Sequence, residues 1–187
     1  MINMDKLKAT LLAIALLLSS STALADGNFW QWLVTFSRQK EVQPVTNKAY
    51  QEECGSCHFA YPPGLLPGKS WAKLLDDKAL NEHFGENASL DADTLKDIRD
   101  YALENSAENS NFKRSRKIAL ATEEGAAPLR IADVRYIKRK HHDIPEKMIK
   151  GNKDVKSLSY CNACHTKAEK GIFDNDTVSI PNYPDYD

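Results

Sequence analysis

Hydrophobic and polar positions follow a helical pattern between residues 46 and 105 of this 187-residue chain and largely lose it after residue 126. Three prolines and two glycines interrupt the pattern in the loop Phe59–Gly68 and exclude a helix there. The pattern therefore predicts a mostly α-helical protein whose C-terminal part is largely irregular. The segments predicted as helices are 46–54, 71–84, 91–105 and 133–140.

The segment 71–84 is predicted to be one helix whose apolar face ends in a histidine. Ser70 precedes it as a good N-cap, and Gly85 follows it where helices commonly end. Residues four apart share one side of a helix, so His83 would extend the apolar face and is a candidate functional residue. The residues of that face are Trp71, Leu75, Ala79 and His83.

The stretch from residue 105 to residue 125 is polar and contains the basic run Lys113–Lys117. Such a run is most often a solvated face, although it would also attract an acidic partner. We interpret this stretch as the boundary between two lobes, residues 26–108 and residues 109–187.

The first 25 residues have the pattern of a secretory signal peptide. Lys6 and Lys8 precede the apolar run Ala9–Leu18, and small residues at Ala23 and Ala25 form a cleavage site. The apolar run is short for a membrane span, so removal is favoured over retention as an anchor. We expect cleavage of residues 1–25 and no integral membrane segment in the mature chain.

The mature chain would carry 23 basic and 25 acidic residues, a net charge of about −2. Nucleic-acid binding needs a clear basic excess, so this balance argues against it.

All four cysteines of the chain lie in two copies of the pattern C-x-x-C-H. This is the attachment signature of c-type haem: two thiols form thioethers with the porphyrin, and the histidine binds the iron. Two copies that use every cysteine predict two covalently bound haems c. Bacteria attach this haem after export, so the expected location is the periplasm. The residues are Cys54, Cys57 and His58 in the first copy, and Cys161, Cys164 and His165 in the second.

The supply of ligands limits how the two irons can be coordinated. Met148 is the only methionine beyond the signal peptide, so methionine cannot bind both irons. His83 follows the first motif by one helix and is the expected second ligand of haem 1. Haem 2 would take His141 or His142, which cannot both bind one iron because adjacent side chains point in different directions.

We also expect a carbonyl of the loop after His58, from Pro62 or Pro63, to accept the Nδ1 proton of that histidine.

Over most of the mature chain the sequence resembles the small bacterial dihaem cytochromes c. Besides the two motifs, the resemblance is carried by Tyr61–Pro67, Ser70-Trp71, His83–Asp91, Leu129–Ile131 and His141. It implies a class I cytochrome-c-like N-terminal haem lobe, a largely irregular C-terminal haem lobe, and histidine at both sixth positions. The His141-His142 doublet departs from the family's single histidine, and the spacing from Arg130 to Ile144 favours His141.

Electron transfer is the predicted function, and the chain is not expected to be an enzyme, because two saturated irons leave no position for a substrate. The expected partners are other redox proteins, such as a membrane b-type cytochrome or a soluble cytochrome. The alternative is a peroxidase-like haem enzyme or a ligand-binding sensor with one open or labile iron. A zinc site fits poorly, because 103 residues separate Cys57 from Cys161.

Overall fold

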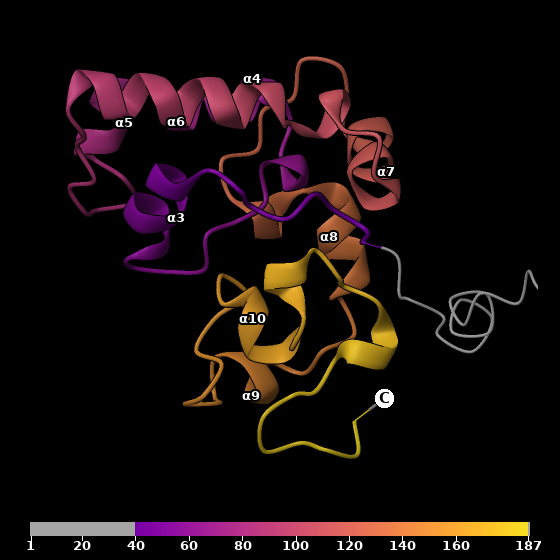
Figure 1. Cartoon of the computed structure of the whole chain (residues 1–187). Helices are drawn as coiled ribbons and strands as arrows, with labels where there is room; N and C mark the ends of the chain where they lie inside the picture. The colour runs from indigo at the N-terminus through magenta and orange to yellow at the C-terminus, as the bar shows by residue number, and fades with distance from the viewer. Residues whose placement is uncertain (1–39, 187) are drawn as a thin grey trace, which may run out of the picture. The chain divides into compact units, whose positions relative to one another are not determined.

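Short helices joined by turns make up residues 40–186, the part of the chain that this computed structural model describes (Figure 1). The predicted signal peptide lies outside these residues. The α-helices are α3 (Lys48–Gly55), α4 (Gly68–Leu74), α5 (Asp77–Asn81), α6 (Ala92–Glu104), α7 (Lys113–Ala121), α8 (Arg135–Lys140), α9 (Glu146–Ile149) and α10 (Cys161–Cys164). The 3₁₀-helices are η2 (Pro63–Leu65), η3 (Ala107–Asn109), η4 (Ile131–Asp133), η5 (Ala168–Lys170) and η6 (Asn175–Thr177).

The prediction of a mostly α-helical protein is confirmed. Within residues 40–186 the β-pairing consists of isolated bridges: His83–Glu86, His165–Val178 and Ile180–Tyr183. No helix in this part of the chain is both long and apolar enough to cross a bilayer.

Two predicted helices form where local signals are strongest. The side chain of Asn47 accepts a hydrogen bond from the Tyr50 backbone N–H (2.7 Å) and caps α3. Asp91 caps α6 in the same way, accepting from the Thr94 N–H (3.0 Å). Ile98 and Ala102, four positions apart on α6, are fully buried, so this face of the helix packs into the core.

The prediction of one helix over residues 71–84 is wrong. The segment forms two helices, because α4 ends at Leu74 and the side chain of Asp76 accepts from the Lys78 N–H (3.1 Å), which starts α5. Ser70 is not an N-cap but lies inside α4, where it is buried. His83 follows α5 in a turn in which Phe84 and Gly85 have φ angles of 55° and 101°.

The basic run is also more than a solvated face. Residues 113–121 form α7, which packs against η2, η3 and α8. Ser115 and Ile118 are fully buried, whereas Lys113, Arg116 and Lys117 are exposed. A boundary between lobes near residue 108 stays a prediction.

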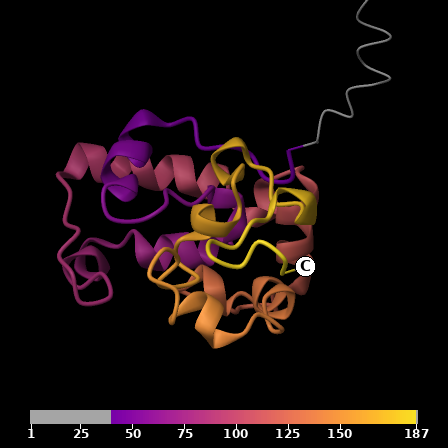
Figure 2. The ribbon, with the colours of Figure 1, turned by 90° about the horizontal axis from the view of Figure 1, so that it is seen from below.

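Residues 40–186 belong to one compact unit, and its hydrophobic core draws on segments far apart in the sequence. The N–H groups of Glu41 and Val42 both donate to the carbonyl of Gly171 (2.7 and 3.1 Å), so the start of the described chain lies beside its C-terminal segment (Figure 2). The largest side chains buried in this core include Val42, Tyr50, Leu66, Ile98, Ile118 and Val134.

Candidate haem-binding sites

The first C-x-x-C-H motif lies at the end of α3. Cys54 is in the last turn of the helix, whereas Cys57 is exposed just beyond it. Nδ1 of His58 lies 2.8 Å from the carbonyl oxygen of Phe59. An Nδ1–H···O bond fixes the tautomer and leaves Nε2 free to bind a metal.

The acceptor for His58 is a carbonyl of the loop, as expected, but not that of Pro62 or Pro63. Both of those carbonyls are used by the 3₁₀ turn η2, accepting from Leu65 (3.0 Å) and Leu66 (3.1 Å). The Pro63 carbonyl also accepts from the indole N–H of Trp71 (2.8 Å).

The ring of His83 faces the ring of His58. The two centroids are 6.4 Å apart, and the ring planes are inclined by 23°. Metal–imidazole bonds of about 2 Å would place the centroids of two rings on opposite sides of one metal roughly 6 Å apart. The spacing of this pair therefore fits a single iron between the two rings.

The second motif forms the one-turn helix α10, with Cys161 first and Cys164 last. His165 follows as the C-cap residue, and its N–H donates to the Cys161 carbonyl (2.8 Å). The C-terminal tail holds this turn: the Ser179 N–H donates to the Cys164 carbonyl (2.9 Å), and Val178 pairs with His165. The tail thus packs against the second motif.

His141 and His142 have different surroundings. The ring centroid of His141 lies 6.0 Å from that of His165, and its Nδ1 is 2.8 Å from the Ile137 carbonyl oxygen, which leaves Nε2 free. Both ring nitrogens of His142 are engaged: Nδ1 lies 2.9 Å from the Arg139 carbonyl oxygen, and Nε2 lies 3.0 Å from Asp143 Oδ1. The structure therefore brings His141, and not His142, to the second motif.

Burial favours the neutral form of some groups at each site. It raises the pKa of the Cys54 and Cys161 thiols to about 12. It also lowers the pKa of His83 and, with the nearby His141 and Arg114, lowers that of His165 to about 4. Neutral imidazole is the form that binds metals, and none of the four cysteines is tied up in a disulfide.

Arg114 is a residue near the second site whose role the sequence pattern did not reveal. It pairs with Glu41, donates to the Phe173 carbonyl (3.1 Å), and is about four-fifths buried. The ring of Phe173 lies 5.3 Å from that of His165, whose Nδ1 is buried without a partner in the described chain. Only its position on the inner side of α7 distinguishes Arg114 from the exposed Lys113.

The residues fit two covalently attached haems: each site has a thiol pair, an adjacent histidine and a second imidazole at one-metal spacing. A cleft of about 480 Å³ is lined by residues of both motifs, among them Cys57, His58 and Asn162. Within residues 40–186 no group of three or more His, Cys, Asp or Glu side chains is arranged to bind a metal ion directly.

Comparisons with known proteins also indicate two haem sites. The profile of the family described as Dihaem cytochrome c matches residues 50–173. The diheme cytochrome type c sb-DHC from Shewanella baltica OS155 is 38% identical, with a TM-score of 0.61 over 75% of this chain and 98% of its own. The diheme cytochrome c from Rhodobacter sphaeroides is also 38% identical, with a TM-score of 0.61 over 71% of this chain and 100% of its own. The comparison with curated proteins finds no match.

Proposed function

Because this chain belongs to the dihaem cytochrome c family and carries two covalently attached haems c, we propose that it is a periplasmic electron carrier with two histidines on each iron. Bound haem supplies an iron that cycles between the ferrous and ferric states by one electron. The proposed ligand pairs are His58 with His83, and His165 with His141.

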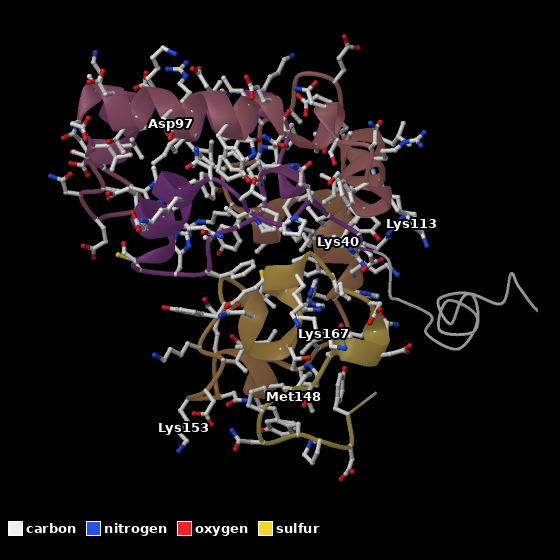
Figure 3. The ribbon with its side chains drawn as sticks, viewed as in Figure 1. Lys40, Asp97, Lys113, Met148, Lys153 and Lys167 are labelled. Carbon is white, nitrogen blue, oxygen red and sulfur yellow. The ribbon has the colours of Figure 1, made fainter. Side chains whose placement is uncertain are left out.

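The observation that carries the proposal is the spacing of the two imidazole pairs, 6.4 Å and 6.0 Å between centroids. Since two histidines saturate an iron, neither site would have a position open to a substrate, and electron transfer without bond formation is the reaction that such sites support. Met148, the methionine nearest in sequence to the second motif, is buried in α9 (Figure 3). Histidine in place of methionine keeps the reduction potential low.

The protein's own groups hold the ligands in place. The Phe59 carbonyl orients the ring of His58, and the Ile137 carbonyl orients the ring of His141, so each presents Nε2. The thioethers from Cys54, Cys57, Cys161 and Cys164 would fix the porphyrins against them. Little reorganisation at the ligands would then accompany a change of oxidation state.

The proposed location and partners follow from the same chemistry. The N-terminal pattern of residues 1–25 favours export, and haem c is attached after export. The partners are proposed to be redox proteins, either a membrane b-type cytochrome or a soluble cytochrome.

The first test is the optical and EPR spectrum of the purified holoprotein, with haem quantified as the pyridine haemochrome. We expect two haems c per chain, both low-spin in the ferric state, and no binding of carbon monoxide in the ferrous state. A high-spin fraction that binds carbon monoxide in the wild-type protein would contradict the proposal and would favour a haem enzyme or a sensor.

The variant His83→Ala tests the first ligand pair. Without the imidazole that faces His58, one of the two haems should become high-spin and bind carbon monoxide, while the other keeps its low-spin signal. A spectrum identical to that of the wild type would refute the assignment of His83.

A further inference from the structure

Tyr61 lies between the first haem-binding motif and the backbone that leads into the second. Its ring centroid is 5.0 Å from that of His58, and the planes are inclined by 31°. Its hydroxyl donates a hydrogen bond of 2.6 Å to the carbonyl of Ser159. Ser159 is separated from Cys161 by a single residue, although it is 98 positions away from Tyr61.

Neighbouring groups fix Tyr61 in this position. The hydroxyl of Tyr50, which is almost fully buried, donates to the Tyr61 carbonyl (2.7 Å). The ring of Phe59 packs edge-on against the ring of Tyr61, with centroids 5.7 Å apart. Burial raises the pKa of Tyr61 to about 12, so its hydroxyl stays protonated and remains a donor at physiological pH.

We propose that Tyr61 couples the two haem sites: its hydroxyl sets the spacing between the two motifs, and its ring and hydrogen bond form a short route for electron exchange between them. This inference rests on the proposed function as an electron carrier. His58 and His165 would each hold an iron, and with both haems bound one electron would pass from one iron to the other, so that one iron would be oxidised as the other is reduced and no further oxidant or reductant would be needed. Tyr61 is neither oxidised nor deprotonated; it is a positioning residue that shortens the path.

The route has few steps. It runs from the His58 ring across a ring-to-ring contact to Tyr61, across one hydrogen bond to the Ser159 carbonyl, and along the backbone to Cys161. Tyr61 therefore connects the two motifs through one ring contact, one hydrogen bond and a short stretch of backbone.

The test compares the holoprotein with its Tyr61→Phe variant, which keeps the ring and removes the bond to Ser159. The matched control is Tyr101→Phe, whose half-buried hydroxyl accepts from the Thr46 N–H (3.0 Å) and joins no haem motif. The rate of electron exchange between the sites is measured from the line widths of the haem methyl NMR resonances in half-reduced protein. EPR of the oxidised protein reports on the axial ligands.

We expect severalfold slower exchange in Tyr61→Phe, with two haems and unchanged ligand signals in EPR, and no change of rate in Tyr101→Phe. Tyr61→Leu, which lacks the ring as well, should be slower still. The inference would be overturned if both Tyr61 variants exchanged electrons at the wild-type rate and differed only in a lower unfolding temperature. Tyr61 would then have a purely structural role. High-spin, carbon monoxide-binding haem in the wild-type protein would instead refute the proposed function, so the two failures are distinguishable.

Discussion

His141 and His142 are adjacent, and the hydrogen bonds of their rings decide which one is available to a metal. His142 uses both nitrogens and its side chain is 65% exposed, whereas His141 is half-buried and keeps Nε2 free opposite His165. Binding of iron by His142 would require it to give up the contact with Asp143 and to turn inward.

The two histidines therefore form a matched pair of variants. In His141→Ala the second haem should lose its sixth ligand, become high-spin and bind carbon monoxide, while His142→Ala should keep two low-spin haems. EPR and optical titration with carbon monoxide distinguish the two outcomes. If His142→Ala opened the haem and His141→Ala did not, the assignment of the second ligand pair would be reversed.

At the residue scale, the sequence identifies the residues that attach the haems covalently. It identifies few of the groups that hydrogen-bond to them. The C-x-x-C-H pattern names six residues because attachment needs two thiols and a histidine at fixed spacing. The partner of the His58 ring was predicted correctly as a loop carbonyl but assigned to the wrong residue. The turn η2 already uses the proline carbonyls, and that turn was not visible in the pattern of residues.

At the scale of elements, α6 was predictable because the capping side chain of Asp91 precedes a regular apolar face, whereas α3 has the cap Asn47 but buries only Tyr50. The segment that forms α4 and α5 has an apolar spacing that continues across the break, so periodicity alone predicts one helix. The break depends on a single capping side chain, Asp76, in the middle of that spacing. Helix α7 was hidden for the opposite reason, since its buried face contains Ser115 and Ile118 within a strongly basic run.

The contact of η2 with α7 gives a prediction at this scale. A Cβ at Gly64 would clash with Ser115 Oγ and would lie 3.3 Å from both Ser115 Cβ and Val42 Cγ1, so Gly64→Ala should overpack the contact. We expect the free energy of unfolding of the holoprotein to fall by about 1–3 kcal/mol in this variant. Denaturant unfolding followed by far-UV circular dichroism measures the change.

Ser115→Ala provides the matching partner for a double-mutant cycle. The buried Ser115 hydroxyl has no hydrogen-bond partner among the described residues, so its removal should be neutral or stabilising. The cost of Gly64→Ala should be smaller in the Ser115→Ala background, because the shortest contact is then absent. Strictly additive effects would mean that the Ser115 hydroxyl is not the group that opposes the added methyl.

At the scale of the whole molecule, contacts between distant segments lie beyond any local pattern. Arg114 joins α7 to Glu41 at the start of the described chain and to Phe173 near its end. Glu41 also accepts from the Phe173 N–H (3.1 Å). These partners are 59 to 132 positions apart, and no spacing rule connects them.

Charge is distributed unevenly along the chain, although the total is close to zero. Residues 48–108, which contain the first haem motif, carry twelve acidic and six basic residues, a net charge of −6. Residues 109–170, which contain the second motif, carry seven acidic and fifteen basic residues, a net charge of +8. Figure 3 shows Asp97 on α6, and Lys113, Lys153 and Lys167 in the later segment; all four are exposed.

This distribution predicts how small charged oxidants react with the reduced holoprotein. A protein whose net charge of about −2 was spread evenly would repel the anion hexacyanoferrate(III). Added salt would screen this repulsion and speed the reaction. If the basic segment around the second site attracts the anion instead, the rate should be highest at low ionic strength and should fall as salt is added. Stopped-flow oxidation over a range of salt concentrations measures this dependence.

Two charge-reversal variants make that test specific to the second site. Lys140→Glu changes an exposed residue directly before His141, and Lys73→Glu changes an exposed residue on α4, so both alter the net charge by −2. Lys140→Glu should lower the low-salt rate severalfold and flatten its salt dependence, whereas Lys73→Glu should leave both nearly unchanged. If the two variants had equal effects, or if the wild-type rate rose with salt, the anion would be responding to the total charge of the protein. It would then not react preferentially at the second site. A difference between the variants would place the entry point for anionic oxidants at the second site.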